Sequence, residues 1–435
     1  MLPKSNLTIT MVHLLSLIAF ALSVPPLYGL PGARAGGTAH PDSTIHLEDL
    51  ILLVRAQNPT LHAAELQAES MSFREQQASA LPYPTFGVSY QPLPIHTARG
   101  TQRSQWRIEQ AIPFPGKTGL RGDVARLTAT RAYSDAERVQ LDLVLDLESS
   151  YSQAYHLQEE LGLMDEFAAD LDRFKEAAAV EYELGRGHQQ AVLRAQLERT
   201  SLEIRSIRLQ TDLRSALERL ALLTNDLGLP SRAARLAPPS LLTDSDASDP
   251  LDVVLQRRPD VQSLETTRTL ADARQRLAGK ESLPDFAVHV AYFDIAAKAP
   301  PTGADGRDAL AVGASVRIPL WGGERKGRRG EAQLEMKRAE SELEALRSAV
   351  ETEIRDLRQQ VAGETRRIEL LQGTLIPQAE TTLEATLAGY TNGNVGFLDL
   401  LDAERMLFEL RSEENSARRR LNVSMARLRH AAAAQ

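Results

Sequence analysis

Two carboxylates stand close together at the start of a helical pattern near the end of the chain. Asp399 and Asp402 are three residues apart, so they share one face of the expected helix, and apolar residues cover the rest of its first turn. Negative side chains suit the positive N-terminal end of a helix, which is the ordinary explanation for such a pair. The same charges would attract cations and repel anions if several copies of the chain met around a pore.

The carboxylate pair follows a point where the chain must reverse. A helical apolar spacing runs up to Leu387 and restarts at Phe397. Glycine and asparagine interrupt the pattern between these two residues, as they do in turns. The segment therefore predicts a helix hairpin with Tyr390 and Gly393 at its tip.

The chain contains this hairpin twice. Tyr182 aligns with Tyr390 and Gly185 with Gly393, in both cases 208 residues apart. Further pairs repeat in the same order: Asn58-Pro59 with Arg258-Pro259, Leu81-Pro82 with Leu283-Pro284, and Ile112-Pro113 with Ile318-Pro319. The slowly drifting separation of about 200 residues indicates a tandem duplication, with a unit much longer than a solenoid repeat.

The N-terminal segment has the pattern of a cleaved secretory signal. Lys4 precedes an apolar run over residues 11–24, and small residues follow as far as Ala35. We therefore expect residues 1–35 to be a signal peptide and the mature chain to be exported. Cleavage removes two cations and no acid, so the formal charge changes from −8 to −10, which implies no nucleic-acid partner.

Each half of the chain carries two segments with strand alternation, within about residues 84–112 and 285–318. Each strand has one apolar face, and polar loops over residues 93–102 and 294–308 join the strands of each pair. No later segment is long and apolar enough for a transmembrane helix, but strands of roughly 9 to 11 residues can cross a bilayer at a tilt. Open sheet edges in lipid leave backbone groups unpaired, so four strands require an oligomer, with eight strands from two chains or twelve from three.

A very long helix follows each pair of strands. The periodicity predicts helices over about residues 117–180 and 325–387, with apolar spacings of three and four that sum to heptads, as in coiled coils. Each helix would extend roughly 95 Å. Pro377 is expected to bend the second helix, whereas the first has Ala169 at the matching place.

These patterns predict a mainly α-helical protein with a small transmembrane β part and a duplicated unit of helix, β-hairpin and long helix. The first repeat covers residues 36–224 and the second covers residues 253–435. Between them, residues 225–252 are rich in Pro, Ser, Asp and Ala and form a linker.

The sequence offers little for catalysis or for a cofactor. The chain has no cysteine, which excludes disulfides and thiolate metal sites, and its histidines lack ligand spacing. No nucleophile elbow and no phosphate-binding loop is present. The basic run over residues 324–330 is more typical of a solvated helix start near a membrane than of an anion site. We expect no enzyme activity, no cofactor and no metal site.

The order of the elements resembles that of TolC-type outer-membrane efflux proteins, over essentially all of the mature length. The resemblance rests on the duplicated order, on the strand exits IPFPGK at 112–117 and IPLWGG at 318–323, and on the two Y-x-x-G tips. It implies a homotrimer whose chains form one twelve-stranded β-barrel in the outer membrane. An α-helical coiled-coil barrel would continue that barrel across the periplasm.

The resemblance also implies a gate at the periplasmic tip. It places Asp399 and Asp402 at the narrowest point of the pore, with Tyr390 and Gly393 on the same hairpin.

The tip of the first repeat would complete the closure, with Tyr182, Gly185 and Gln190 in the matching hairpin. This tip departs from the family pattern, because Ala191 stands where an aspartate is often found.

We therefore expect an outer-membrane exit duct of a tripartite efflux or type I secretion system in a Gram-negative bacterium. Its expected partners are a periplasmic adaptor protein, an inner-membrane pump and outer-membrane lipid, and transport through the duct itself would be passive. A periplasmic coiled-coil scaffold or adaptor is the alternative, although it leaves the apolar-faced strands without a purpose. An autonomous porin would not need helices of this length.

Overall fold

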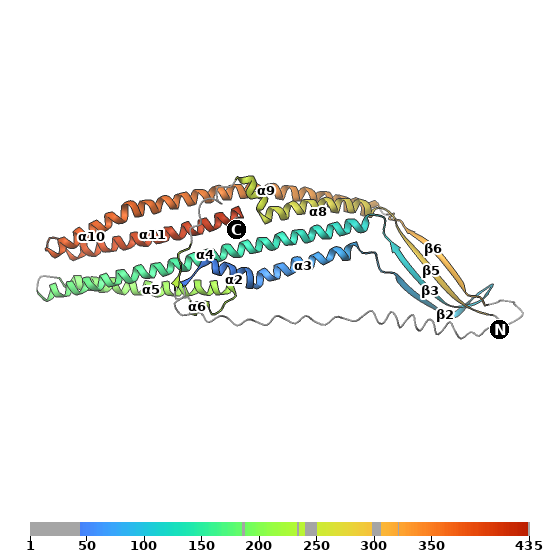
Figure 1. Cartoon of the computed structure of the whole chain (residues 1–435), viewed down its shortest axis with the longest axis horizontal. Helices are drawn as coiled ribbons and strands as arrows, with labels where there is room; N and C mark the ends of the chain where they lie inside the picture. Colours follow the sequence, from blue (N-terminus) through green and yellow to red (C-terminus); the bar gives the residue numbers. More distant parts are fainter. Residues whose placement is uncertain are drawn as a thin grey trace. The chain divides into compact units, whose positions relative to one another are not determined.

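Helices and strands follow one another in the same order in the two halves of the chain (Figure 1). The computed structural model describes residues 44–184, 188–232, 235–239, 250–297, 306–320 and 322–433, which all belong to one unit, Asp42–Gln435. The predicted signal peptide lies outside the described residues.

The first half contains two helices, a strand pair, a helix hairpin and a short closing segment. Its elements are β1 (Thr44–Ile45), α2 (Leu47–Gln57), α3 (Pro59–Ser79), β2 (Thr85–Thr97), β3 (Gly100–Ile112), α4 (Lys117–Glu183), α5 (Gln189–Thr224), α6 (Leu229–Arg232) and β4 (Arg235–Leu236). The segment expected to be a linker therefore contains α6 and β4, and β4 pairs in parallel with β1.

The second half repeats the order. Its elements are α7 (Leu251–Arg257), α8 (Pro259–Glu281), β5 (Asp285–Ala296), β6 (Ala309–Arg317), α9 (Gly322–Leu370), α10 (Ile376–Thr391) and α11 (Phe397–Ala432). A π-helical turn, Leu371–Leu375, joins α9 to α10 immediately before Pro377. Proline has no N–H for the preceding turn and crowds its carbonyl, and a wider turn accommodates both effects. The expected interruption is therefore present, and α4 runs past Ala169 without one.

The two repeated X-Pro pairs perform equivalent tasks. Asn58 begins α3 by accepting hydrogen bonds from the next turn, and its Nδ2 donates to the Leu223 carbonyl at the end of α5, at 2.7 Å. In the second half Arg258 precedes α8, and its Nη1 donates to the Ala431 carbonyl at the end of α11, at 2.7 Å. Both residues are buried. In each half, therefore, one buried polar side chain ties the start of the helix before the strands to the end of the returning helix.

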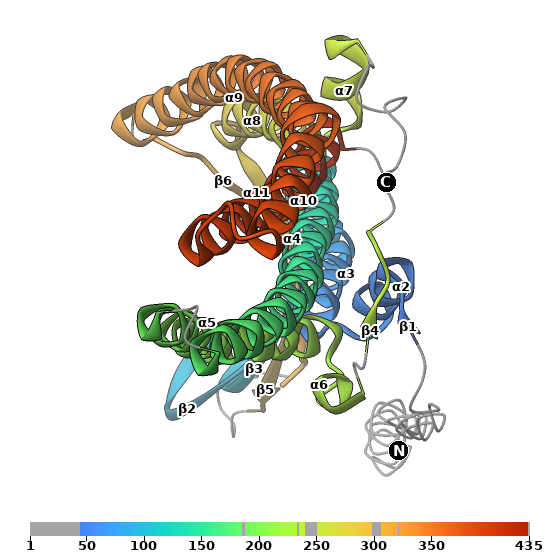
Figure 2. The same ribbon diagram turned by 90° about the vertical axis from the view of Figure 1, so that its left-hand side faces the viewer.

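The helices and strands form one layer, four elements wide. The strand order is β2-β3-β5-β6, and all three pairings are antiparallel. On the sheet side the helices pack in the order α3-α4-α8-α9, and on the tip side in the order α5-α4-α11-α10 (Figures 1 and 2). Because the layer does not close within the chain, β2 and β6 are left at the edges of the sheet, α3 and α9 at the edges of the helices beside it, and α5 and α10 at the edges near the tips.

The first strand pair is longer than the sequence indicated. Residues 93–102 were expected to be a loop, but β2 continues to Thr97 and β3 begins at Gly100. Pairing is interrupted after Tyr90 and resumes at Ile95, which spans the two prolines of this stretch. A strand at a sheet edge has one side without pairing demands, so it tolerates prolines that a central strand does not.

Several small apolar clusters replace a single core. One lies where α2, α4, α5 and β4 meet, and a second joins α4, α5 and α11 near the tips. Two more lie along α11, against α7 and α9 and against α10. The helices of the tip half are thus held together by separate apolar seams, as in coiled coils.

Candidate functional site

The register of the sheet brings apolar side chains together across all four strands. Two rows of directly opposed residues show this: Phe86, Ile108, Val290 and Val312, and Val88, Trp106, Tyr292 and Leu310. Seven of these eight side chains are exposed, with Val312 at 77% and Phe86 at 62% of full exposure, and Trp106 is half-buried. Within the described residues no helix covers this face, which is the exposed apolar patch expected of a surface that contacts lipid or another protein.

The opposite face of the sheet carries small and polar side chains. One row consists of Gly87, Arg107, Ala291 and Ala311, and a second of Thr85, Glu109, His289 and Gly313. Gly313 lies opposite His289, where a Cβ would stand 2.6 Å from the imidazole. The strand alternation predicted from the sequence is therefore present, with one apolar and one polar face.

The tip of the second hairpin is a tight glycine-dependent turn between α10 and α11. Gly393 has φ +75°, which side-chain-bearing residues rarely adopt, and its N–H donates to the Tyr390 carbonyl at 3.0 Å. The N–H groups of Asn394 and Val395 both point to the Gly389 carbonyl. A Cβ at Gly389 would stand 2.5 Å from the Val395 side chain. These two glycines explain why α10 ends where it does.

Asp399 and Asp402 both lie exposed on the first turns of α11. Asp399 accepts a hydrogen bond from the Gly396 N–H at 3.1 Å, so its carboxylate caps its own helix. No hydrogen bond or ion pair of Asp402 is found in the described part of the chain. The ordinary role of a helix cap therefore belongs to Asp399, while Asp402 is open to other groups.

Tyr390 lies between the two tips rather than at the outer end. It is half-buried and makes an edge-to-face contact with Phe397, with ring centroids 6.0 Å apart. Burial, together with the nearby Glu181 carboxylate of α4, raises the pKa of Tyr390. Tyr390 and Ala191 pack against the same apolar cluster. An apolar side chain thus occupies the position where the family pattern has an aspartate.

The first tip is described on both sides of its turn. Tyr182 is at the end of α4 and Gln190 is near the start of α5, and both side chains are exposed. Gly185 lies outside the described residues. The structure thus brings Tyr390 into contact with the apolar seam between the hairpins and leaves Tyr182, Gln190 and the two aspartates on the surface.

The seam between the hairpins contains a carboxylate that the sequence analysis did not single out. Phe167 of α4 stacks on Phe408 of α11 with ring centroids 4.6 Å apart. Glu404, one turn before Phe408, is only 6% exposed, and burial raises its pKa. An acidic residue at an apolar position of the helical pattern was the signal that could have found it.

A buried polar network ties α4 to α11 farther from the tips. His156 is 4% exposed, and Asn415 lies 2.7 Å from its Nδ1 while Asn422 lies 3.0 Å from its Nε2. Asn415 also donates to the His156 carbonyl at 2.9 Å and to Glu160 at 3.1 Å. Ser412 donates to Glu160 at 2.6 Å. This network was missed because the histidines looked scattered along the chain.

Burial lowers the pKa of His156 to about 4, although its hydrogen bond with Asn415 opposes the shift. The ring is therefore neutral at neutral pH, and its two partners assign it the tautomer that donates from Nδ1 and accepts at Nε2.

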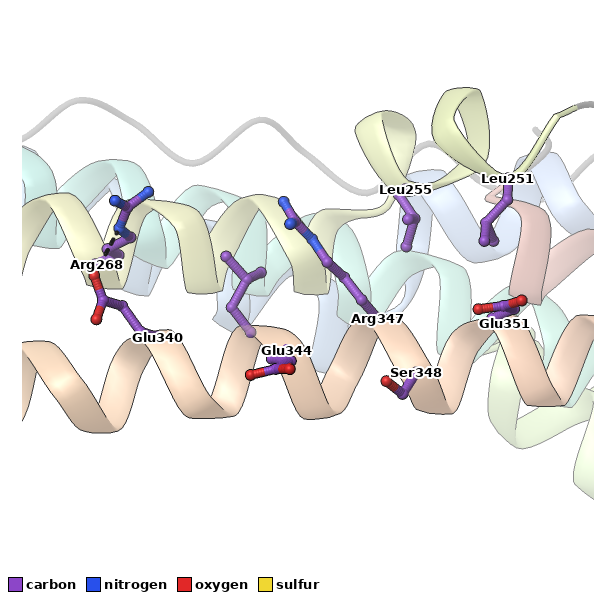
Figure 3. Close-up of a pocket in the computed structure, with 9 residues that line it drawn as sticks. Leu251, Leu255, Arg268, Glu340, Glu344, Arg347, Ser348 and Glu351 are labelled. Atoms are coloured by element: carbon purple, nitrogen blue, oxygen red, sulfur yellow. Dashed lines mark ion pairs between the residues drawn. The ribbon is translucent and has the colours of Figure 1, made fainter.

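A groove of about 560 Å³ lies between α7, α8 and α9 (Figure 3). Two leucines of α7 line one side of it. Arg268 pairs with Glu340 at 3.5 Å, and Arg347 pairs with Glu265 at 3.0 Å, so these cations have partners within the chain. Among the described residues, no cluster of three or more His, Asp or Glu side chains is arranged to hold a metal ion. None of the described helices has the length and apolar character needed to cross a membrane.

The fold is that of solved outer-membrane channels. VceC from Vibrio cholerae aligns with a TM-score of 0.74 at 19% identity, over 89% of this chain and 95% of that chain. The CmeC outer membrane channel of Campylobacter jejuni aligns with a TM-score of 0.73 at 15% identity, over 94% of both chains.

The second half of the sequence matches a family model. The model for outer membrane efflux proteins matches residues 251–434. The cobalt-zinc-cadmium resistance protein CzcC of Cupriavidus metallidurans is 24% identical over 369 residues, which cover 84% of each protein. The match of residues 251–434 to this model and the fold together support the predicted resemblance to outer-membrane efflux proteins.

Proposed function

We propose that the protein is the passive exit duct of a tripartite efflux or type I secretion system. The observation that carries the proposal is the sheet, which has an exposed apolar face across four strands and an unpaired strand at each edge. In a bilayer, each unpaired backbone group costs several kcal/mol, so the edges β2 and β6 require strands from other chains. Three chains supply the twelve strands of a barrel wide enough for water.

The helical edges support the same assembly. Four exposed apolar residues of α5 follow spacings of four, seven and three, which place them on one face: Leu193, Leu197, Ile204 and Ile207. Their exposure ranges from 50% to 65%. Such a stripe at the edge of a four-helix layer fits the edge helix of a neighbouring chain. Closure of the helical layers of three chains would form a coiled-coil barrel continuous with the strands.

The duct performs no chemistry of its own, so a periplasmic adaptor and an inner-membrane pump must supply the cargo and the energy. The rival proposal of a periplasmic scaffold leaves the apolar sheet face in water, where a patch of this kind promotes aggregation. The likeness to a protein named for cobalt-zinc-cadmium resistance makes divalent metal cations the cargo class that we propose.

The gate that we propose lies at the tip of the second hairpin. Asp399 and Asp402 from three chains would place six carboxylates around one constriction. Gly393 would set the turn that presents them, and Tyr390 would hold this hairpin against the first one, whose tip carries Tyr182, Gly185 and Gln190.

Assembly is the first test of the duct. Extracted in a mild detergent, the mature protein should have a mass near three times that of one chain, because the two open edges are paired only in a closed ring. Light scattering that separates protein from detergent mass measures this. A monodisperse monomer with helix but no strand signal in circular dichroism would contradict the proposal.

Orientation is the second test, and the absence of cysteine makes it direct. A cysteine in place of Ala98, in the exposed turn between β2 and β3, should react with an impermeant maleimide on intact cells. A cysteine in place of Asn394, at the opposite end of the helices, should react only after the outer membrane is permeabilised. Labelling with the opposite preference would invert the orientation.

A further inference from the structure

The start of α9 carries cations that the rest of the chain leaves open. Between Arg317 and Glu331 the sequence has five basic and two acidic residues. Arg328 pairs with Glu281 and, at 2.7 Å, with Glu324. Arg325 and Lys326 are exposed, and within the described residues neither has a hydrogen-bond or ion-pair partner.

The equivalent junction of the first half uses its cations differently. Lys117 is 2% exposed, and its Nζ lies 2.7 Å from Asp285 and 2.8 Å from the Leu283 carbonyl. Lys280 donates to the Pro115 carbonyl at 3.2 Å. The cations at the exit of β3 therefore hold the protein together, whereas those at the exit of β6 face outward. This asymmetry leaves Arg325 and Lys326 available to a group outside the chain.

The open cations lie at the border of the apolar sheet face. The apolar alternation of β6 continues beyond the strand to Ile318 and Leu320, which are 60% and 73% exposed. Arg325 follows five residues after Leu320. Arg328 contacts Glu281 at the end of α8, which places the first turns of α9 beside the entry to β5. A Cβ at Gly323, Gly327 or Gly330 would meet nothing within 4 Å, so no described residue packs against these three positions.

From this arrangement we propose that Arg325 and Lys326 bind the phosphodiester headgroup of an anionic phospholipid in the periplasmic leaflet. The apolar sheet face holds the acyl chains, and the two cations lie where that face ends and the aqueous helices begin. Basic residues next to a membrane-embedded segment favour anionic headgroups in this way. The inference rests on the proposed function, because it needs the sheet in a bilayer with the tips in the periplasm.

The test measures headgroup preference in bilayers that contain the reconstituted protein. Spin-labelled phosphatidylglycerol and phosphatidylcholine are compared by electron spin resonance, which separates lipid held at the protein surface from bulk lipid. The wild-type protein should prefer phosphatidylglycerol. The Arg325→Gln, Lys326→Gln double variant should lose most of this preference, since each basic residue near an anionic surface contributes at most about fivefold.

A matched control is available on the same helix. Lys337 and Arg338 are also an exposed adjacent pair of cations, although Arg338 pairs with Glu342 at 3.6 Å. They lie roughly 18 Å farther along the helix, beyond the Debye length of about 10 Å. Lys337→Gln with Arg338→Gln should keep the preference. An equal loss in this control would overturn the proposal, because the effect would then be one of net charge. A charge-preserving exchange, Arg325→Lys with Lys326→Arg, should also keep the preference.

The remaining outcomes also decide the question. A preference that persists in the Arg325→Gln, Lys326→Gln variant overturns the proposal. If inorganic phosphate displaces the lipid at constant ionic strength, the two cations form a site for a free anion instead. If the Arg325→Gln, Lys326→Gln variant loses the trimer but keeps the lipid preference, the cations bind a neighbouring chain instead. If no lipid of either kind is held at the protein surface, the duct itself fails, which distinguishes the two proposals.

Discussion

Replacing Asn415 by leucine should lower the free energy of unfolding by about 2 to 6 kcal/mol per chain, the largest stability loss that we expect from one polar side chain. Asn415 accepts from His156 and donates to Glu160, and both of these residues are buried. Leucine has a similar size but no polar atoms. The change therefore leaves the imidazole N–H and one carboxylate oxygen without partners, and each such loss costs about 1 to 3 kcal/mol.

The matched control is an exposed amide in the π-helical turn Leu371–Leu375, whose partner Glu414 directly precedes Asn415. Gln372 donates to Glu414 at 2.6 Å on the surface, so Gln372→Leu should change stability by no more than about 0.5 kcal/mol. Urea unfolding of the detergent-solubilised protein, followed by circular dichroism, measures both variants. Equal effects of the two substitutions would show that the buried network does not bind α4 to α11.

A second substitution shows whether the loss of stability comes from the broken hydrogen bond or from a change in packing. In a double-mutant cycle, His156→Phe with Asn415→Leu should cost less than the sum of the two single changes, because the double variant no longer buries an unpaired imidazole. Strict additivity would mean that the two side chains act independently.

Much of this fold could be predicted because its signals are local. Heptad spacing gave the positions of α4, α9 and α10, and the interruption before Pro377 followed from the missing N–H of proline. Strict alternation gave the apolar and polar faces of the four strands. Residues 93–102 were wrongly expected to be a loop, because whether a strand with prolines lies at a sheet edge depends on the other strands.

The site was less predictable because its contacts are far apart in sequence. His156 and Asn415 are 259 residues apart, and only the register between α4 and α11 brings them together. The strands β1 and β4 are two residues long, too short for a periodic signal. By contrast, the contact of Asp399 with the backbone at the start of its own helix could be predicted, because it is local in sequence. A carboxylate in the first turn of a helix lies within reach of the preceding backbone N–H.

A test of the gate must separate the effect of the aspartate charges on permeation from the effect of Asp399 as the cap of α11. Asp399→Ala removes both the charge and the acceptor for the Gly396 N–H, with an expected cost of about 0.5 to 2 kcal/mol. Asp399→Asn removes the charge but keeps an oxygen that accepts the bond. Asp402 has no such role in the described structure, so Asp402→Asn changes charge alone.

In planar bilayers, Asp399→Asn with Asp402→Asn should therefore lower the cation-to-anion permeability ratio about tenfold while the trimer stays intact. A charge about 7 Å from a cation contributes about 0.6 kcal/mol in water, so six together remain substantial after salt screening. Block of the conductance by zinc, cobalt or cadmium should weaken as well, because the carboxylates that would hold these cations have been neutralised. The double alanine variant should show the same conductance change together with a weaker helix start. If only the alanine variant changes selectivity, the aspartates act through the cap on α11, and the constriction lies at Tyr390 and the first tip instead.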